Sequence, residues 1–349
     1  MDISEIVPKN NGYLIGHDYA LKTLLDAYNK NSLHNSWLIS GVEGIGKATL
    51  AYKFARFLLN EAESGGKERT TMDIAESSQA FRLVSMGAHP DMKVIERDYT
   101  DTEKRKIVKA IKDGESLSES ELKDLKKSAF IRVDDVRTIG EFLSKKSSND
   151  GWRVVLIDSI DDMNQASANA VLKVLEEPPY KTVMLLISHN PAKLLPTIKS
   201  RCAKLNLKPL EENEVASLLR RYRPDVKEAD VKKIAMISSG SIGKAILYVD
   251  NDALTRYDSL CKIIYAKNKF NIKDLLSFCE SAAKDEEIYE LSKELVLKFL
   301  SEYAKSSANS IEIMDAWDYT VKTFDETDRL NMDKKQVMVN VINNIAKVI

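Results

Sequence analysis

The sequence predicts an α/β fold with a parallel sheet and flanking helices, followed by a second part made of helices alone. Three observations lead to this prediction. A glycine-rich loop joins an apolar strand to a helix within residues 37–51, two more apolar runs at 152–158 and 183–187 alternate with helical patterns, and strand patterns stop at Leu210. Strands that alternate with helices are typical of an open α/β sheet.

The glycine-rich loop follows a phosphate-binding pattern, which is glycine, four residues, glycine, lysine, and then serine or threonine. In such a loop, backbone N–H groups converge on phosphate oxygens at the start of a helix, where the helix dipole also favours negative charge. The candidate nucleotide-binding residues of the loop are Gly41, Gly44, Gly46, Lys47, Ala48 and Thr49. The alternative is a strand-to-helix turn that binds no ligand.

Ala48 stands where the pattern requires a hydroxyl, which normally holds the magnesium ion of a bound nucleotide. Thr49 does not easily replace that hydroxyl, because one step along a helix rotates the side chain by about 100°. Lys47 still brings a positive charge toward the outer phosphates. The loop therefore predicts a site that ATP or ADP can occupy, with magnesium only as part of the bound nucleotide.

Composition narrows the classes of protein that need to be considered. Charged residues make up 30% of the chain, hydrophobic residues 44%, and the formal net charge is −1, so no global basic field attracts nucleic acid. The three cysteines, Cys202, Cys261 and Cys279, are widely spaced and odd in number, which favours a reducing compartment. No apolar run approaches the ~20 residues of a membrane span, and the N-terminus lacks a signal-peptide core. We expect a cytoplasmic protein without a membrane partner.

The elements of the first part follow from hydrophobic periodicity. Continuously apolar strands are typical of a buried parallel sheet, and Pro178 and Pro179 end the helix that precedes the last strand. The segment 97–127 is dense in Lys, Glu and Asp, and its pattern is typical of a solvated helical or mobile insertion. The expected elements are helix 20–28, strand 37–40, helix 48–59, a short apolar run 92–95, helix 131–143, strand 152–158, helix 166–175 and strand 183–187.

The second part of the chain shows helical patterns throughout. One helix ends at Pro224, another ends near Gly240, and Ser241 begins a short third one. In the tail, Leu291, Leu295 and Phe299 share one helical face, and Val337, Val341 and Ile345 share another. We therefore expect three domains: a phosphate-loop α/β domain at 1–208, a three-helix lid at 209–250 and an all-helical domain at 251–349.

This organisation resembles the AAA+ ATPase superfamily, and three motifs sharpen the resemblance. The turn His89-Pro90-Asp91, the run 167–179 (SANAVLKVLEEPP) and Ser200-Arg201-Cys202 together resemble bacterial clamp-loader subunits. Within that group the chain is similar to the delta-prime family of DNA polymerase III. The resemblance covers residues 12–250 with specific motifs and is only topological over the helical tail, which it implies to be a collar domain for oligomerisation.

Three positions depart from the pattern of a working ATPase in this superfamily. Asp158 matches the aspartate that positions magnesium, but Ser159 replaces the glutamate that activates water, and a serine without a partner is no general base. Gly243 stands where related motor subunits carry an arginine, and Lys244 beside it is expected to face solvent. Together with Ala48, these losses predict a chain that does not hydrolyse ATP. Asp158 could instead cap the following helix.

Two further sites are open to two interpretations each. Ser188-His189-Asn190 occupy the sensor position of the family that the chain resembles, where one of them could hydrogen-bond a phosphate. The alternative is that they only shape a turn. The resemblance also makes Arg201 an arginine finger, which acts in trans on ATP held by a neighbouring subunit, whereas the alternative is a surface salt bridge. Cys202 is expected to be a small buried residue rather than a nucleophile.

The resemblance implies a non-hydrolysing subunit of a ring that loads the sliding clamp on primed DNA during replication. Its partners would be the gamma/tau ATPase subunits, the delta subunit, the clamp and primer-template DNA. No zinc is expected, because the segment 60–88, where related subunits carry a four-cysteine module, has no cysteine. The rival hypotheses are a catalytically active AAA+ ATPase in replication and an accessory ATPase of DNA repair.

Overall fold

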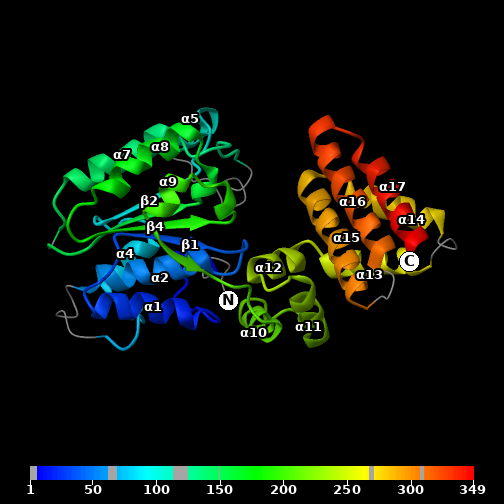
Figure 1. Cartoon of the computed structure of the whole chain (residues 1–349), viewed down its shortest axis with the longest axis horizontal. Coiled ribbons are helices and arrows are strands. Elements are labelled where there is room, and N and C mark those ends of the chain that lie inside the picture. The colour runs from blue at the N-terminus through cyan, green and yellow to red at the C-terminus, as the bar shows by residue number, and fades with distance from the viewer. Residues whose placement is uncertain (1–5, 62–68, 113–124, 149, 267–270, 307–309) are drawn as a thin grey trace. The chain divides into compact units, whose positions relative to one another are not determined.

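The computed structural model describes residues 6–61, 69–112, 125–148, 150–266, 271–306 and 310–349. The chain divides into two compact units, Met1–Glu214 and Val215–Ile349. The first unit contains the sheet, and the second consists of helices (Figure 1). The predicted fold class, a parallel α/β sheet with flanking helices followed by a helical part, is confirmed.

The sheet of the first unit has five strands, all parallel, in the order β2-β3-β4-β1-β5. The phosphate-loop strand β1 thus lies between β4 and β5. Every residue of β1 and β4 is buried, which explains why the predicted runs were continuously apolar. The strands are β1 (Ser36–Ser40), β2 (Met92–Glu96), β3 (Arg153–Asp158), β4 (Thr182–Ser188) and β5 (Ala203–Asn206).

Alternate residues of each strand enter two separate cores, because successive side chains of a strand point to opposite faces. On β3, Val154 and Leu156 pack with α1 and α2, whereas Val155 and Ile157 pack with α7 and α8. Figure 1 shows α1, α2 and α4 on one face of the sheet and α5, α7 and α8 on the other. The helices are α1 (Asp18–Asn29), α2 (Lys47–Leu59), α4 (Gln79–Ser85), α5 (Asp101–Lys112), α7 (Val133–Ser144), α8 (Gln165–Glu176) and α9 (Pro196–Ser200).

Three short elements were missed by the sequence analysis. β5 and α9 have four and five residues, too few for a hydrophobic period to show. α4 lies in the segment 60–88, which reads as merely polar, yet Phe81 and Val84 are buried. The charged segment 97–127 contains a helix, α5, while its residues 113–124 lie outside the described part of the chain.

The second unit contains the helical faces that the sequence predicted, and all six of their residues are at most 3% exposed. Among the described residues, no helix combines the length and apolar character needed to cross a bilayer. The division into a lid at 209–250 and a collar at 251–349 stays a prediction. The helices are α10 (Glu212–Tyr222, which begins in the first unit), α11 (Glu228–Ile237), α12 (Ile242–Asp250), α13 (Ala253–Tyr265), α14 (Ile272–Ala282), α15 (Glu286–Ser306), α16 (Ser310–Leu330) and α17 (Lys334–Val348).

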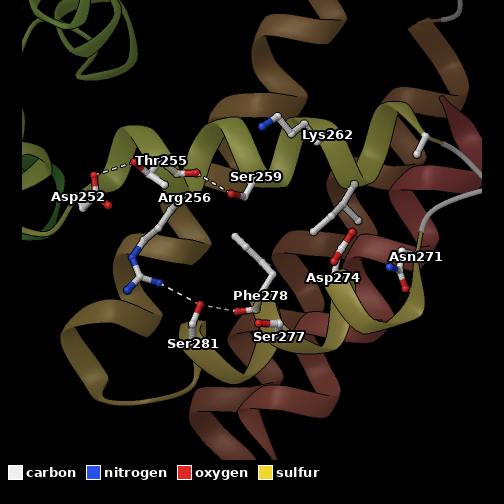
Figure 2. A pocket seen from close by; sticks show the side chains of 12 residues that line it. Asp252, Thr255, Arg256, Ser259, Lys262, Asn271, Asp274, Ser277, Phe278 and Ser281 are labelled. Atoms are coloured by element: carbon white, nitrogen blue, oxygen red, sulfur yellow. Dashed lines mark hydrogen bonds between the residues drawn. The ribbon is translucent and has the colours of Figure 1, made fainter.

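A groove of about 540 Å³ separates α13 from α14 in the helical unit. Figure 2 shows Arg256 of α13 reaching across it to the Ser281 hydroxyl, at 3.2 Å. The lining charges of Arg256 and Lys262 are matched in number by the carboxylates of Asp252 and Asp274. This balance gives the groove no preference for an anionic or a cationic ligand.

Candidate phosphate-binding site

The glycine-rich loop runs from the carboxyl end of β1 to Lys47, the first residue of α2. Two of its glycines are required by the fold. Gly46 has φ +103°, a value that side chains rarely tolerate. A Cβ on Gly41 would lie 2.6 Å from the carbonyl oxygen of Leu207, so no other residue fits there without moving the backbone. The buried imidazole of His17 donates from Nε2 to the Ile45 carbonyl at 2.7 Å, which holds the loop against the start of α1.

Lys47 lies folded on its own loop. Its Nζ donates to the carbonyl oxygens of Gly41 at 2.8 Å and Val42 at 2.6 Å, and the residue is only 3% exposed. Burial lowers the pKa of Lys47 to about 8, although the nearby carboxylates of Glu43 and Asp158 oppose this shift. Lys47 therefore lies at the loop where a phosphate contact is predicted, and to act as that contact it must exchange its two carbonyl bonds for bonds to phosphate oxygens.

The magnesium side of the loop lacks its hydroxyl, as the sequence indicated. Ala48 is half-buried and offers no oxygen, and Thr49 is 8% exposed on the next position of α2. The two following residues, Leu50 and Ala51, are fully buried in the core beneath the sheet. The helix therefore continues directly into the core, and Lys47, in its first turn, is hydrogen-bonded to the loop.

Asp158 is half-buried at the carboxyl end of β3, on the same edge of the sheet as the loop. Burial raises the pKa of its carboxyl group; the charge of His189 lowers it, Glu96 raises it further, and Lys47 lowers it. The alternative role as a helix cap is wrong, because the next helix, α8, is capped by Asn164, whose side chain accepts from the Ser167 N–H, and the short turn Ile160–Asp162 is capped at Ser159. Asp158 thus remains a candidate ligand for the cation that accompanies a bound phosphate group.

A neighbouring carboxylate, Asp161, organises this edge of the sheet and was missed by the sequence analysis. One oxygen, Oδ1, accepts from the Ser188 hydroxyl at 2.9 Å and the Asn190 N–H at 3.2 Å. The other, Oδ2, accepts from the Ser159 hydroxyl at 2.8 Å and the His189 N–H at 2.6 Å. Burial alone would raise the pKa of Asp161, but these hydrogen bonds outweigh it and lower the pKa.

The Asp161 hydrogen bonds involve two of the sites that the sequence singled out, the turn 188–190 and Ser159. Ser188, His189 and Asn190 form a turn that is closed around the Asp161 carboxylate, as the turn-shaping interpretation expects, and the role of these residues as a phosphate sensor stays a prediction. The Ser159 hydroxyl donates to Asp161, and because the pKa of that carboxyl is lowered, Asp161 is a weak base for taking up the hydroxyl proton. In the sequence, the only local indication of this hydrogen-bonding role was the position of Asp161, three residues after a buried strand.

We expect Asp161→Asn to destabilise the first unit by about 2 kcal/mol. The substitution removes the charge of the acceptor that four donors share, and hydrogen bonds to a charged group contribute roughly 1.5–3 kcal/mol. Urea unfolding at neutral pH measures this loss. The matched control is Asp162→Asn, which removes only a partly exposed pair with Arg97 and should cost less than about 1 kcal/mol. Equal losses for both variants would contradict the role of Asp161.

The Asp161 contribution has a predictable pH dependence. A carboxyl group with a lowered folded-state pKa stabilises the protein above its unfolded value of about 3.9, and this stability is lost as the pH falls through the folded-state pKa. The difference in stability between the wild type and Asp161→Asn should therefore shrink in acid and not in alkali.

Arg201 follows α9 and its guanidinium group contacts two acceptors. Nη2 lies 2.7 Å from Oε1 of Glu176, the last residue of α8, and Nη1 donates to the Thr197 carbonyl at 3.0 Å. About a third of the side chain, 35%, is exposed. Arg201 thus forms the surface salt bridge of the alternative interpretation, and its role as an arginine finger stays a prediction.

The register of the sheet places Arg201 far from its own loop. Ala203, two residues after Arg201, pairs with Trp37 at the start of β1, whereas the loop begins at Gly41 after β1 ends. Four residues of strand at ~3.3 Å each put about 13 Å between these levels. Arg201 therefore lies at the amino edge of the sheet, and the phosphate-binding loop lies at the carboxyl edge.

Two other predicted positions have plain structural roles. Cys202 is 8% exposed, and burial raises its pKa to about 11, which excludes a reactive thiolate at neutral pH. Lys244 was expected to face solvent. Its ammonium group instead forms an ion pair with Glu294 of α15 at 2.8 Å. Within the described ranges, no three His, Cys, Asp or Glu side chains come together as metal ligands.

Residues 16–211 match the family model described as DNA polymerase III, delta subunit. Curated relatives include the DNA polymerase III subunit delta' of Pseudomonas aeruginosa, 34% identical over 59% of this chain and 53% of the relative. The subunit delta' of Escherichia coli K12 is 27% identical over 69% of this chain and 62% of the relative. The subunit tau/gamma of Haemophilus influenzae is 27% identical over 70% of this chain and 31% of the relative.

The chain thus spans 31% to 62% of the length of these relatives. Among solved structures, a gamma subunit-related protein of DNA polymerase III from Thermotoga maritima aligns over 94% of this chain and 98% of its own length. It superposes only loosely, with 19% identity and a TM-score of 0.41.

Proposed function

The chain belongs to the DNA polymerase III delta-subunit family, as a delta-prime-like clamp-loader subunit of the AAA+ class, and from this premise we propose that it hydrolyses no ATP itself and supplies Arg201 to ATP bound by a neighbouring subunit. The observation that carries this proposal is the position of Arg201 at the amino edge of the sheet, opposite its own phosphate-binding loop. A guanidinium group at that edge serves a nucleotide of another chain more readily than its own.

The chemistry of the chain's own site also supports the proposal. Hydrolysis needs a magnesium ligand after the lysine and a base that activates water, and the chain has Ala48 and Ser159 at these positions. The Ser159 hydroxyl is bound to Asp161. The loop glycines and Lys47 still form a place for the phosphates of ATP or ADP, where Asp158 would face the accompanying magnesium ion.

The partners follow from the same role. We propose that the helical unit joins the chain to gamma/tau ATPase subunits and to delta, in a cytoplasmic assembly that loads the sliding clamp on primer-template DNA. The rival function is a catalytically active AAA+ ATPase in replication or repair, for which the preserved loop and Lys47 are the supporting features.

Two measurements separate these functions. The chain alone should show no steady-state ATP turnover above that of Lys47→Ala, and it should assemble with gamma/tau and delta subunits of its own source on a sizing column. Turnover by the chain alone that Lys47→Ala removes would identify an active ATPase. Failure to assemble would contradict the partner assignment.

Nucleotide binding should weaken as the pH rises through the pKa of Lys47. Phosphate is attracted by the protonated lysine, which in the free chain loses its proton with a pKa of about 8. We expect the apparent Kd for ATP to rise about tenfold between about pH 7 and about pH 9, because each pH unit above the pKa costs a factor of ten. Titration with a fluorescent ATP analogue measures this change. Lys47→Ala is the control, with weak binding at every pH; an equal pH dependence in that variant would contradict the assignment.

A further inference from the structure

Glu176 holds the guanidinium group of Arg201 at a defined place on the amino edge of the sheet. The carboxylate oxygen lies 2.7 Å from Nη2, and the Thr197 carbonyl accepts from Nη1 at 3.0 Å. A guanidinium group has five N–H donors, so these two contacts leave most of its donors for a phosphate. The contacts therefore orient the side chain without saturating it.

Both groups that hold Arg201 stand on rigid elements. Glu176 ends α8, a helix of twelve residues whose preceding residue, Leu175, is buried in the core. At the other end of α8 the buried Ser167 hydroxyl donates to the Ile131 carbonyl at 2.7 Å. Thr197 lies in α9 next to Ile198, which is 1% exposed. These two contacts therefore favour one placement of a long side chain that would otherwise sample many rotamers.

We infer that Glu176 is a positioning residue for Arg201, which keeps the guanidinium group aimed outward at the amino edge for the phosphates of the neighbouring subunit. This inference rests on the proposed function. The negative end of the α8 dipole lies at the same place and also favours a cation there. Pre-ordering a catalytic side chain removes part of the entropy cost that would otherwise be met during the reaction.

The size of the effect follows from exposure. The side chains of Arg201 and Glu176 are 35% and 49% exposed, so water screens their attraction and the bond is easily exchanged. An arginine finger changes the rate by ~10³–10⁵-fold, far more than an exposed ion pair can. Phosphate can therefore displace the Glu176 carboxylate from Arg201, and removal of this carboxylate should change the rate only about three- to tenfold.

The test uses the assembled clamp loader with clamp and primed DNA, and follows ATP hydrolysis at the site that Arg201 faces. Glu176→Gln keeps the length of the side chain and removes its charge. We expect kcat to fall about three- to tenfold with KM for ATP unchanged, and the difference from wild type to narrow at high ionic strength. Glu177→Gln, which changes the adjacent exposed carboxylate, is the matched control and should behave as wild type.

A double-mutant cycle separates positioning from a merely structural role. In the Arg201→Ala background, Glu176→Gln should have no further effect on kcat. An equal loss in both backgrounds, or no loss beside intact Arg201, would overturn the inference while leaving the finger in place. If Arg201→Ala itself left hydrolysis unchanged, the proposed function would fail, and the inference with it.

Discussion

Replacing Arg201 by alanine in the assembled clamp loader is expected to slow ATP hydrolysis by about 10³–10⁵-fold at the one site that Arg201 faces. Removal of the planar cation leaves the charge that develops on the transferred phosphoryl group without its stabilising partner, which raises the barrier by about 4–7 kcal/mol. The side chain is partly exposed, and its bonds within the chain are to Glu176 and Thr197. Folding and assembly should therefore survive the change.

The measurement must isolate the affected site, since the other ATP sites of the proposed ring would continue to turn over. Single-turnover hydrolysis in rings whose remaining ATPase subunits carry inactivating lysine substitutions in their own phosphate loops provides this isolation. Arg201→Lys should stay strongly impaired, because an ammonium group lacks the fork that matches phosphate. Arg137→Ala is the matched control, as it removes another exposed arginine that pairs with Asp134. An unchanged rate for Arg201→Ala would remove the arginine finger from the proposal.

Replacing Arg56 by alanine is expected to destabilise the first unit by about 3–5 kcal/mol, because it combines a cavity with the loss of buried hydrogen bonds. Arg56 is 2% exposed. Its Nη1 donates to the Lys9 carbonyl at 2.9 Å, its Nη2 donates to the Asn11 carbonyl at 2.6 Å, and its guanidinium carbon lies 4.5 Å from the centre of the Phe81 ring. Burial lowers the pKa of Arg56 to about 10, so the group stays protonated at neutral pH.

Urea unfolding followed by tryptophan fluorescence measures the loss, since Trp37 lies in the same core as α2. A loss of this size is a large share of the ~5–15 kcal/mol that stabilises a typical domain. Arg56→Lys should recover only part of it, because one ammonium group cannot match the two carbonyls that the fork reaches. The exposed Arg137→Ala should lie within about 0.5 kcal/mol of wild type. Equal stability of Arg56→Ala and Arg137→Ala would show that Arg56 does not anchor the N-terminal segment.

Elements and motifs that are local in sequence were predicted well. The strand, loop and helix around Lys47 follow one another within about twenty residues, and their hydrophobic period is long enough to recognise. β5 could not be found in this way. Its four residues are defined by pairing with β1, for instance at Ser40 and Asn206, whose side chains are hydrogen-bonded across 166 positions of the chain.

The same limit applies to the candidate site. Asp161 binds a turn that lies 27–29 residues further along the chain, and Arg201 is paired with a carboxylate 25 positions earlier. Neither pairing has a sequence pattern, because the two partners come from different elements that meet only when β3, β4 and the intervening helix α8 are packed. The sequence named both Ser188 and Arg201, but it left their partners undetermined.

By itself, the sequence determined which side-chain groups are missing from the two nucleotide motifs, because alanine at position 48 has no side-chain oxygen and serine at position 159 has no carboxylate in any conformation. Only the tertiary structure decided where the remaining functional groups lie. The parallel register of β1 and β5 sets Lys47 and Arg201 at opposite edges of one sheet. That separation arises from hydrogen bonds between distant strands, so no local pattern of residues contains it.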